Sequence, residues 1–186
     1  MTKSIPLEPS LLPGVGLLRP PFHQDGRGSF TKPYSPEVLA ALAAPFPIAE
    51  VYWSQSGPGT VRGMHFQVPP TPIAKIVFAT AGKVRDVVLD LRVGSPAFGE
   101  FAVFDLAPGS GAVVVPHGCA HGFEVTEGPA VLVYLQDGAF DPATDAGIRW
   151  DSFGMDWLVS EPTLSARDPA LPSLADFESP FVWTGA

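Results

Sequence analysis

The stretch Ala74–Arg92, AKIVFATAGKVRDVVLDLR, decides the fold class. It contains two runs that are rich in β-branched and apolar residues, with Ala81-Gly82 between them. Each run has the length and composition of a β-strand, and a glycine between two such runs is a turn signal. The stretch therefore predicts two β-strands that are joined by a turn at Ala81-Gly82.

Further strands are predicted from about Ala49 to Leu135. The runs EFAVFDL, GAVVVP, HGFEV and PAVLVYL have the same composition and are separated by turn signals such as Pro108-Gly109. No long helical pattern lies between them, which argues against a parallel α/β sheet. We therefore predict a mainly β protein that forms a closed barrel or a sandwich.

One helix is predicted in the segment SPEVLAALAA, which begins at Ser35. It has a capping serine, a proline at the first helical position and a glutamate in the first turn, and Pro45 ends it. After Asp137 the chain becomes polar and irregular, with tryptophans at 150, 157 and 183. We predict a single domain over residues 1–186, whose C-terminal tail of about 140–186 packs on the barrel.

The composition limits the classes of function. The formal net charge of −8 argues against nonspecific nucleic-acid binding, and no apolar run approaches the roughly 20 residues of a membrane helix. Cys119 is the single cysteine, so an intramolecular disulfide is impossible. The first 18 residues are interrupted by prolines and predict no signal peptide. We expect a soluble, cytoplasmic protein with 11 Lys and Arg available for an anionic ligand.

The stretch VRGMHFQ carries the first chemical signal. Alternate residues of a strand share a face, so His65 and Gln67 lie together while Met64 and Phe66 point the other way. One face of this predicted strand is therefore apolar, and the other carries functional groups.

The stretch HGFEVTEGPAVLVY carries the second signal. A symmetric turn between Glu127 and Gly128 would pair His121 with Tyr134 across two strands. Cross-strand partners have Cβ atoms about 5 Å apart, so an imidazole and a phenol would lie side by side.

These residues allow three interpretations. His65, His121 and a carboxylate could bind a metal, although Gln67 is a poor ligand. Alternatively, the residues could transfer protons during enolisation next to a ketone. In that case a histidine is the base, Tyr134 is the acid, and Lys75 or a histidine stabilises the negative oxygen. As a third possibility, each is an ordinary core or surface residue.

Several motifs together resemble the dTDP-4-dehydrorhamnose 3,5-epimerases. In order along roughly residues 13–170, they are DGRGSF, RGMHFQ, Lys75, GSPAFGEF, PHGCAHGF, Tyr134 and LSARD. The resemblance implies a cupin-like jelly-roll barrel, with a few short helices, that acts as a homodimer without a metal or other cofactor. It also implies inversion of C3 and C5 of a nucleotide-linked 4-keto-6-deoxyhexose in a deoxysugar pathway.

The resemblance assigns roles to individual residues. His65 resembles the base that removes a proton, and Asp168 resembles the carboxylate that orients this base. Tyr134 resembles the acid on the opposite face, Lys75 resembles the cation beside the C4 oxygen, and His121 lines the same cavity.

The substrate-binding candidates follow from the same resemblance. Arg62 and Arg167 resemble pyrophosphate contacts, and Arg27 resembles part of a nucleotide site that the partner subunit completes. The full set of candidates is Arg27, Arg62, Gln67, Arg167, Glu50 and Asp86.

The sequence departs from the family's pattern around the nucleoside and the sugar. Lys32 replaces an acidic residue, Glu50 and Tyr52 replace a Gln-x-Asn motif, and Leu135 and Phe140 replace a lysine and a tyrosine. The inverted carbon (C3, C5 or both) and the nucleotide (dTDP, CDP or GDP) therefore stay open. A metal-dependent cupin enzyme and a non-catalytic sugar-binding module are the alternatives from other classes.

Overall fold

Strand β7, Lys75–Asp90, is the central strand of the computed structural model, which describes residues 7–40, 42 and 45–185. The predicted turn at Ala81-Gly82 is wrong, because the strand continues through these residues and bends. Gly82 has a φ of +69°, and a Cβ here would lie 2.6 Å from the Cα of Ala130. The glycine therefore permits both the bend and the close approach of the neighbouring strand.

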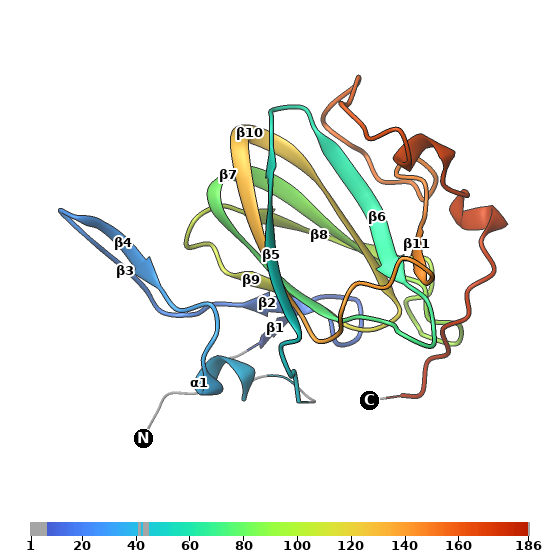
Figure 1. The fold of residues 1–186 in the computed structure, drawn as a ribbon, viewed down its shortest axis with the longest axis horizontal. Helices are drawn as coiled ribbons and strands as arrows, with labels where there is room; N and C mark the ends of the chain where they lie inside the picture. The colour runs from blue at the N-terminus through green and yellow to red at the C-terminus, as the bar shows by residue number, and fades with distance from the viewer. Residues whose placement is uncertain (1–6, 41, 43–44, 186) are drawn as a thin grey trace.

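Strand β10, Cys119–Gln136, runs antiparallel to β7 along its length. The register between them shifts in the segment from Val125 to Leu132, beside the bend of β7, and the two strands arch over together (Figure 1). The predicted hairpin between Glu127 and Gly128 is therefore wrong, since both halves of β10 pair with β7 and not with each other.

The arch divides the β-structure into two walls that face each other. The first wall has the order β5-β10-β7-β9-β2-β1 and contains residues 130–136 of β10 and 75–81 of β7. The second wall has the order β11-β6-β10-β7-β8 and contains residues 119–125 and 84–90 of the same strands. The other strands are β1 (Leu7–Pro9), β2 (Gly16–Leu18), β3 (Phe22–Asp25), β4 (Gly28–Thr31), β5 (Glu50–Ser56), β6 (Val61–Gln67), β8 (Phe101–Leu106), β9 (Ala112–Val115) and β11 (Asp145–Gly147). The prediction of a mainly β jelly roll is confirmed.

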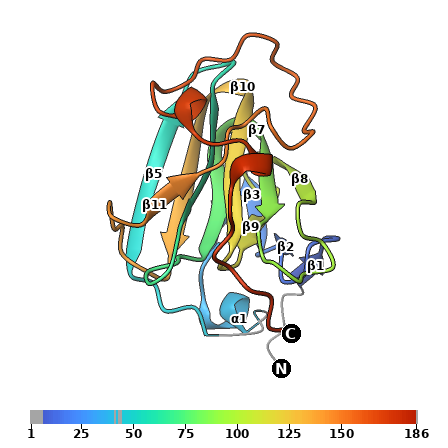
Figure 2. The same cartoon turned by 90° about the vertical axis from the view of Figure 1, so that its right-hand side faces the viewer.

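The C-terminal tail covers the outer face of the second wall (Figure 2). Phe153, Met155 and Phe181 of the tail form one buried cluster with Met64 and Phe66 of β6. The alternation predicted for β6 is therefore confirmed: its apolar face lies under the tail. A strand that is buried on both faces explains why β7 reads as a nearly continuous apolar run.

The helices are short. The helix predicted from Ser35 is α1, Pro36–Leu39, and the Ser35 hydroxyl accepts a hydrogen bond from the Val38 N–H at 3.3 Å. Its predicted continuation lies partly outside the described residues. Two 3-10 helices follow in the tail, η1 (Asp168–Ala170) and η2 (Leu174–Asp176). Across the described part of the chain, every helix is too short to cross a membrane.

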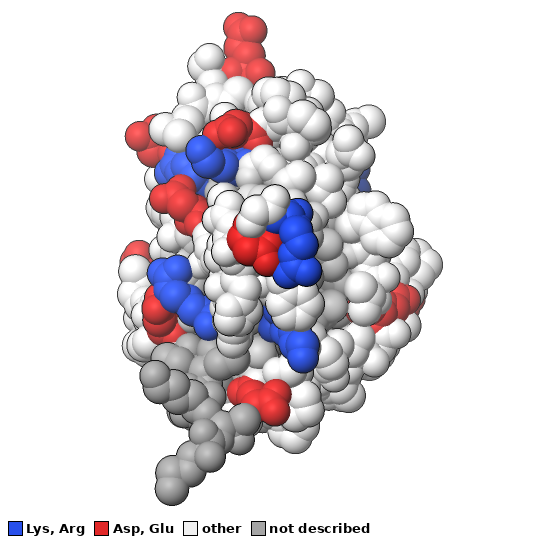
Figure 3. All heavy atoms as spheres, turned by 90° about the vertical axis from the view of Figure 1, so that its left-hand side faces the viewer, with Lys and Arg blue, Asp and Glu red and all other residues white. Residues whose placement is uncertain are grey.

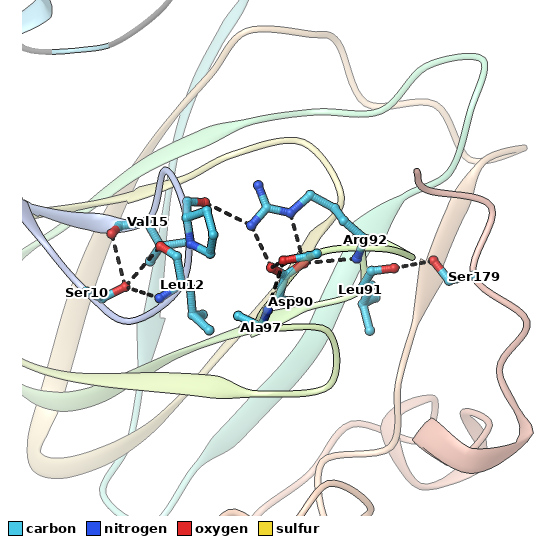
Figure 4. A network of polar contacts seen from close by, with 10 residues as sticks. Ser10, Leu12, Val15, Asp90, Leu91, Arg92, Ala97 and Ser179 are labelled. Carbon is cyan, nitrogen blue, oxygen red and sulfur yellow. Dashed lines mark hydrogen bonds and ion pairs between the residues drawn. The ribbon is translucent and has the colours of Figure 1, made fainter. Parts of the chain in front are cut away.

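A buried ion pair at the end of β7 joins two distant parts of the chain (Figure 4). Asp90 accepts hydrogen bonds from Arg92 at 2.7 and 2.8 Å and from the Ser95 hydroxyl at 2.7 Å. Arg92 also donates to the carbonyl of Pro13 at 2.8 Å and lies over the ring of Trp183. The guanidinium thus connects the N-terminal loop and the tail to β7.

Glu124 on β10 makes a second connection between barrel and tail. Its carboxylate, 1% exposed, lies 2.6 Å from Arg85 Nη1 and accepts hydrogen bonds from the N–H groups of Leu158 and Val159. These donors compensate the negative charge of a carboxylate that is buried away from water.

We expect Glu124→Ala to lower the free energy of unfolding by about 3–5 kcal/mol, because Arg85 and two N–H groups lose their acceptor. Urea denaturation measures this change. Glu127→Ala is the control on the same strand, since it breaks only an exposed ion pair with Lys83 and is expected to change stability little. Equal losses in both variants would contradict the role of Glu124.

Candidate active site

A cavity of about 470 Å³ opens between the two walls. The first wall contributes Glu50, Tyr52 and Ser54 from β5, Lys75 from β7, and Tyr134 and Gln136 from β10. The second wall contributes Arg62, His65 and Gln67 from β6 and His121 from β10. A concave site of this size, with several polar groups on its walls, suits a small-molecule ligand.

His65 and Asp168 form a hydrogen-bonded pair at this cavity. His65 Nε2 lies 2.8 Å from Asp168 Oδ1, and the Asp168 backbone N–H is held by the hydroxyl of Ser165. Burial acts to raise the pKa of Asp168, but the hydrogen bond and charge of His65, together with hydrogen bonds from Ser165 and the Gly63 backbone, hold this pKa below its ordinary value. The carboxylate therefore stays ionised and fixes the orientation of the imidazole.

Tyr134 faces His65's wall from the opposite side of the cavity. Burial raises the pKa of this phenol, so it keeps its proton at neutral pH. Its ring is stacked on Tyr52 and meets His121 edge-on, with 5.9 Å between the ring centroids. The predicted proximity of His121 and Tyr134 is confirmed, but it arises from two walls that face each other.

Lys75 is a buried cation in the same cavity. Its ammonium donates a hydrogen bond to the carbonyl of His65 at 3.5 Å. Burial lowers its pKa to about 8, although the charges of Asp145 and Asp86 oppose this effect. Lys75 is therefore positively charged at neutral pH and loses its charge in mildly alkaline solution.

His121 has a carboxylate partner of its own. Its Nε2 lies 2.7 Å from Asp86 Oδ2, and Asp86 is fully buried. Burial raises the pKa of Asp86, while the charges of His121 and Lys75 act to lower it. The other oxygen, Oδ1, has no hydrogen-bond partner within the described residues. Asp86 was predicted from the sequence as a substrate contact. In the structure it lies behind His121 and does not line the cavity.

The two predicted pyrophosphate contacts lie on the cavity wall. Arg62 Nε donates to the hydroxyl of Ser56 at 2.9 Å, and Arg167 forms an ion pair with Asp145 at 2.7 Å. With Lys75, these guanidinium groups are the local cations that an acidic protein needs for an anionic ligand.

Gln67 has a structural role. Its amide donates to the carbonyl of Thr71 at 2.7 Å and accepts from the N–H of Asp141 at 2.8 Å. It therefore holds the loops around the cavity, and its hydrogen-bonding groups are already engaged.

Arg27 does not reach the cavity of its own chain. It lies at the turn of the β3–β4 hairpin, which projects from the barrel (Figure 1), and it is paired with Asp25 at 2.6 Å. Its side chain is 91% exposed.

Several cavity residues were not predicted from the sequence. Ser54 and Gln136 could have been found, because strand alternation places them on the same face as the candidates Glu50 and Tyr134, respectively. Asp145 begins the short strand β11, and nothing in its sequence context marks it.

In the described part of the chain, no three His, Cys, Asp or Glu side chains are grouped so that they could hold a metal ion. His65 and His121 are cross-strand neighbours, yet each is bound to a different carboxylate. This arrangement favours proton transfer by two separate His–Asp pairs.

Comparison with known proteins agrees with this geometry. The sequence model of the family described as dTDP-4-dehydrorhamnose 3,5-epimerase matches residues 9–176. The chain belongs to this family. A dTDP-4-dehydrorhamnose 3,5-epimerase of Sinorhizobium fredii is 34% identical over 172 residues, covering 90% of this chain and 88% of the relative. A dTDP-4-dehydrorhamnose 3-epimerase of Streptomyces niveus is 38% identical over 174 residues, covering 91% and 84%.

A solved structure of the family has the same fold. The dTDP-4-dehydrorhamnose 3,5-epimerase of Bacillus anthracis, with TDP and PPi bound, superposes with a TM-score of 0.86. It is 31% identical in sequence, and the match covers 91% of this chain and 99% of that one.

The pKa of Lys75 predicts an alkaline limit of activity. We expect kcat/KM for the epimerisation to fall as the pH rises through about 8, because the neutral amine no longer stabilises a negative oxygen. Lys75→Arg should move this limit to higher pH, since a guanidinium stays charged. An identical limit in both proteins would show that another group titrates.

The same pKa has a consequence for stability. Because it lies below the ordinary value of 10.5, the folded protein binds fewer protons at Lys75 than the unfolded chain between about pH 8 and 10.5. The contribution of Lys75 to stability therefore becomes more favourable as the pH rises through this window.

Proposed function

We propose that this protein is a nucleotide-sugar epimerase that inverts C3, C5 or both in a dTDP-4-keto-6-deoxyhexose. The observation that carries the proposal is the placement of His65 and Tyr134 on opposite walls of one cavity. An epimerase has to remove a proton from one face of a carbon and return a proton to the other face. A base and an acid that face each other supply both steps.

The proposed reaction passes through an enolate. His65 takes the proton from a carbon next to the C4 ketone, and the electron pair of the broken C–H bond moves onto the C4 oxygen. The ammonium of Lys75 stabilises this oxygen, and Asp168 stabilises the imidazolium of His65. Tyr134 then donates its proton to the opposite face of the carbon and restores the ketone.

The diphosphate is proposed to bind to the guanidinium groups of Arg62 and Arg167. The relative from Bacillus anthracis binds TDP and PPi, which supports a thymidine nucleotide. The identity of 38% to a 3-epimerase supports a second candidate, an enzyme that inverts C3 alone. Two His–Asp pairs and a facing phenol support an enzyme over a sugar-binding module, since binding alone requires no acid opposite a base.

We also propose a homodimer. Phe22 and Phe30 on the β3–β4 hairpin are exposed, as are Val51 and Trp53 on the outer face of β5. Figure 3 shows that the side from which the hairpin projects is mostly uncharged, with a few scattered charged groups. A second copy would cover these apolar side chains and could receive Arg27 at its own cavity.

We propose that residues 1–186 form one catalytic unit that works in the cytoplasm. Cys119 is buried, and as the single cysteine it has no partner for a disulfide within the chain. A protein without internal disulfides suits a reducing compartment.

Proton exchange tests the proposed function. In D₂O with dTDP-4-keto-6-deoxyglucose, NMR should show deuterium entering C3, C5 or both, and EDTA should not slow this exchange. His65→Ala should slow exchange by about 10²–10⁴-fold, because the base is lost. Binding of dTDP, measured by calorimetry, should change little in this variant.

Three results would contradict the proposed function in different ways. Exchange with only a CDP- or GDP-linked sugar would change the nucleotide. Dependence on a metal would favour a metal-dependent cupin enzyme. No exchange with any of these sugars would exclude the epimerase.

Sedimentation velocity tests the homodimer. We expect the wild-type protein to sediment with twice the mass of the chain, and Trp53→Asp to shift it towards the monomer, because a carboxylate at an apolar interface loses its hydration. A wild-type monomer at micromolar concentration would contradict the proposal.

A further inference from the structure

Strand β5 builds the part of the cavity wall that lies beside the phenol of Tyr134. Its alternate residues Glu50, Tyr52 and Ser54 all line the cavity. The register of β5 with β10 places Tyr52 directly opposite Tyr134, in the same wall. This pairing brings two phenols together at the point where one of them is the proposed acid.

The two tyrosine rings are stacked. Their centroids are 4.6 Å apart, and their planes differ by 8°. Aromatic pairs in such contact gain about 0.5–1.5 kcal/mol beyond the burial of their area. Tyr134 is therefore held against a flat surface that leaves its ring little freedom to rotate.

Tyr52 is itself fixed at its other end. Its hydroxyl donates a hydrogen bond to the side-chain carbonyl of Gln136 at 2.9 Å. Gln136 is 3% exposed, and its amide nitrogen lies 3.4 Å from a carboxylate oxygen of Glu50. The ring that supports Tyr134 is thus anchored to a buried side chain of the same wall.

The hydroxyl of Tyr134 is the part of this side chain that can transfer a proton in the cavity. Tyr52 covers one face of its ring, and His121 meets the ring at an edge. The hydroxyl lies 3.3 Å from Ser54 Oγ and adjoins the cavity. The neighbours of Tyr134 therefore fix the direction from which its proton can be delivered.

We propose that Tyr52 is a positioning residue for Tyr134, and that it determines how often the enolate is protonated with inversion. The inference rests on the proposed function, because it requires His65 as base and Tyr134 as acid. An enolate can take its proton from Tyr134, which inverts the carbon, or from the His65 imidazolium, which restores the original configuration. A phenol held by Tyr52 favours the first outcome.

The two outcomes can be separated in D₂O. The side chain of His65 is 33% exposed, so its N–H proton can exchange with the solvent before it is returned. Return from His65 then gives a deuterated sugar of unchanged configuration, while transfer from Tyr134 gives a deuterated sugar of inverted configuration. NMR of dTDP-4-keto-6-deoxyglucose measures both products at each carbon.

We expect Tyr52→Ala to lower the rate of inversion by about 10–100-fold, the cost of a misplaced catalytic group. Deuterium incorporation with retained configuration should become the main reaction, so total exchange falls much less than inversion. Tyr52→Phe keeps the ring and removes only the hydrogen bond to Gln136. Tyr52→Phe should therefore keep the wild-type ratio of inversion to exchange, which Tyr52→Ala loses.

A double-mutant cycle tests whether Tyr52 acts through Tyr134. Tyr134→Phe removes the donated proton, so Tyr52→Ala should change the ratio no further in that background. The inference is overturned if inversion and exchange fall together in Tyr52→Ala, or if Tyr52→Phe shows the same ratio as Tyr52→Ala. A wild-type protein without any exchange overturns the proposed function itself, and the inference with it.

Discussion

The shared bend of β7 and β10 is the constraint on which the rest of the structure depends. Gly82 lets β7 change direction where the backbone of β10 lies against it. Two strands that bend together turn one ribbon into two facing walls. The cavity, and the placement of functional groups on both of its sides, follow from this single change of direction.

The polar groups of the cavity show how an acidic chain keeps charges in a buried site. His65 and His121 are each paired with a separate buried carboxylate. Lys75 carries an ammonium group, and burial lowers its pKa. A buried carboxylate or ammonium is costly to desolvate, so each has a partner nearby: an imidazole beside Asp168 and Asp86, and the carboxylates of Asp145 and Asp86 near Lys75. The same balance leaves the ammonium available for a negative charge that develops during a reaction.

The sequence was sufficient to predict the fold class, since runs of β-branched residues identify strands wherever they occur. It was not sufficient to predict their connections. A glycine between two apolar runs is compatible with a turn and with a bend, and only the packing of Ala130 against Gly82 distinguishes them. His121 and Tyr134 were predicted to meet through a hairpin and instead meet across the barrel.

Some features of the candidate site could be predicted from local sequence patterns, and others could not. Strand alternation placed His65 and Gln67 on one face, which the structure confirms. The pairing of His65 with Asp168 spans 103 positions, and only the family resemblance indicated it. The side chain of Tyr52 was noted as a departure from the family pattern, but its stacking on Tyr134 depends on the register of β5 with β10. No local pattern encodes that register.

The tail covers the barrel and also supplies one residue of the candidate active site. Asp168 belongs to the tail, whereas His65, Lys75 and Tyr134 belong to the barrel strands. The barrel alone therefore holds an acid and a cation, and its base becomes oriented only when the tail is docked. A local release of the segment around Asp168 would therefore leave His65 without the carboxylate that orients it, even while the walls of the cavity stay in place.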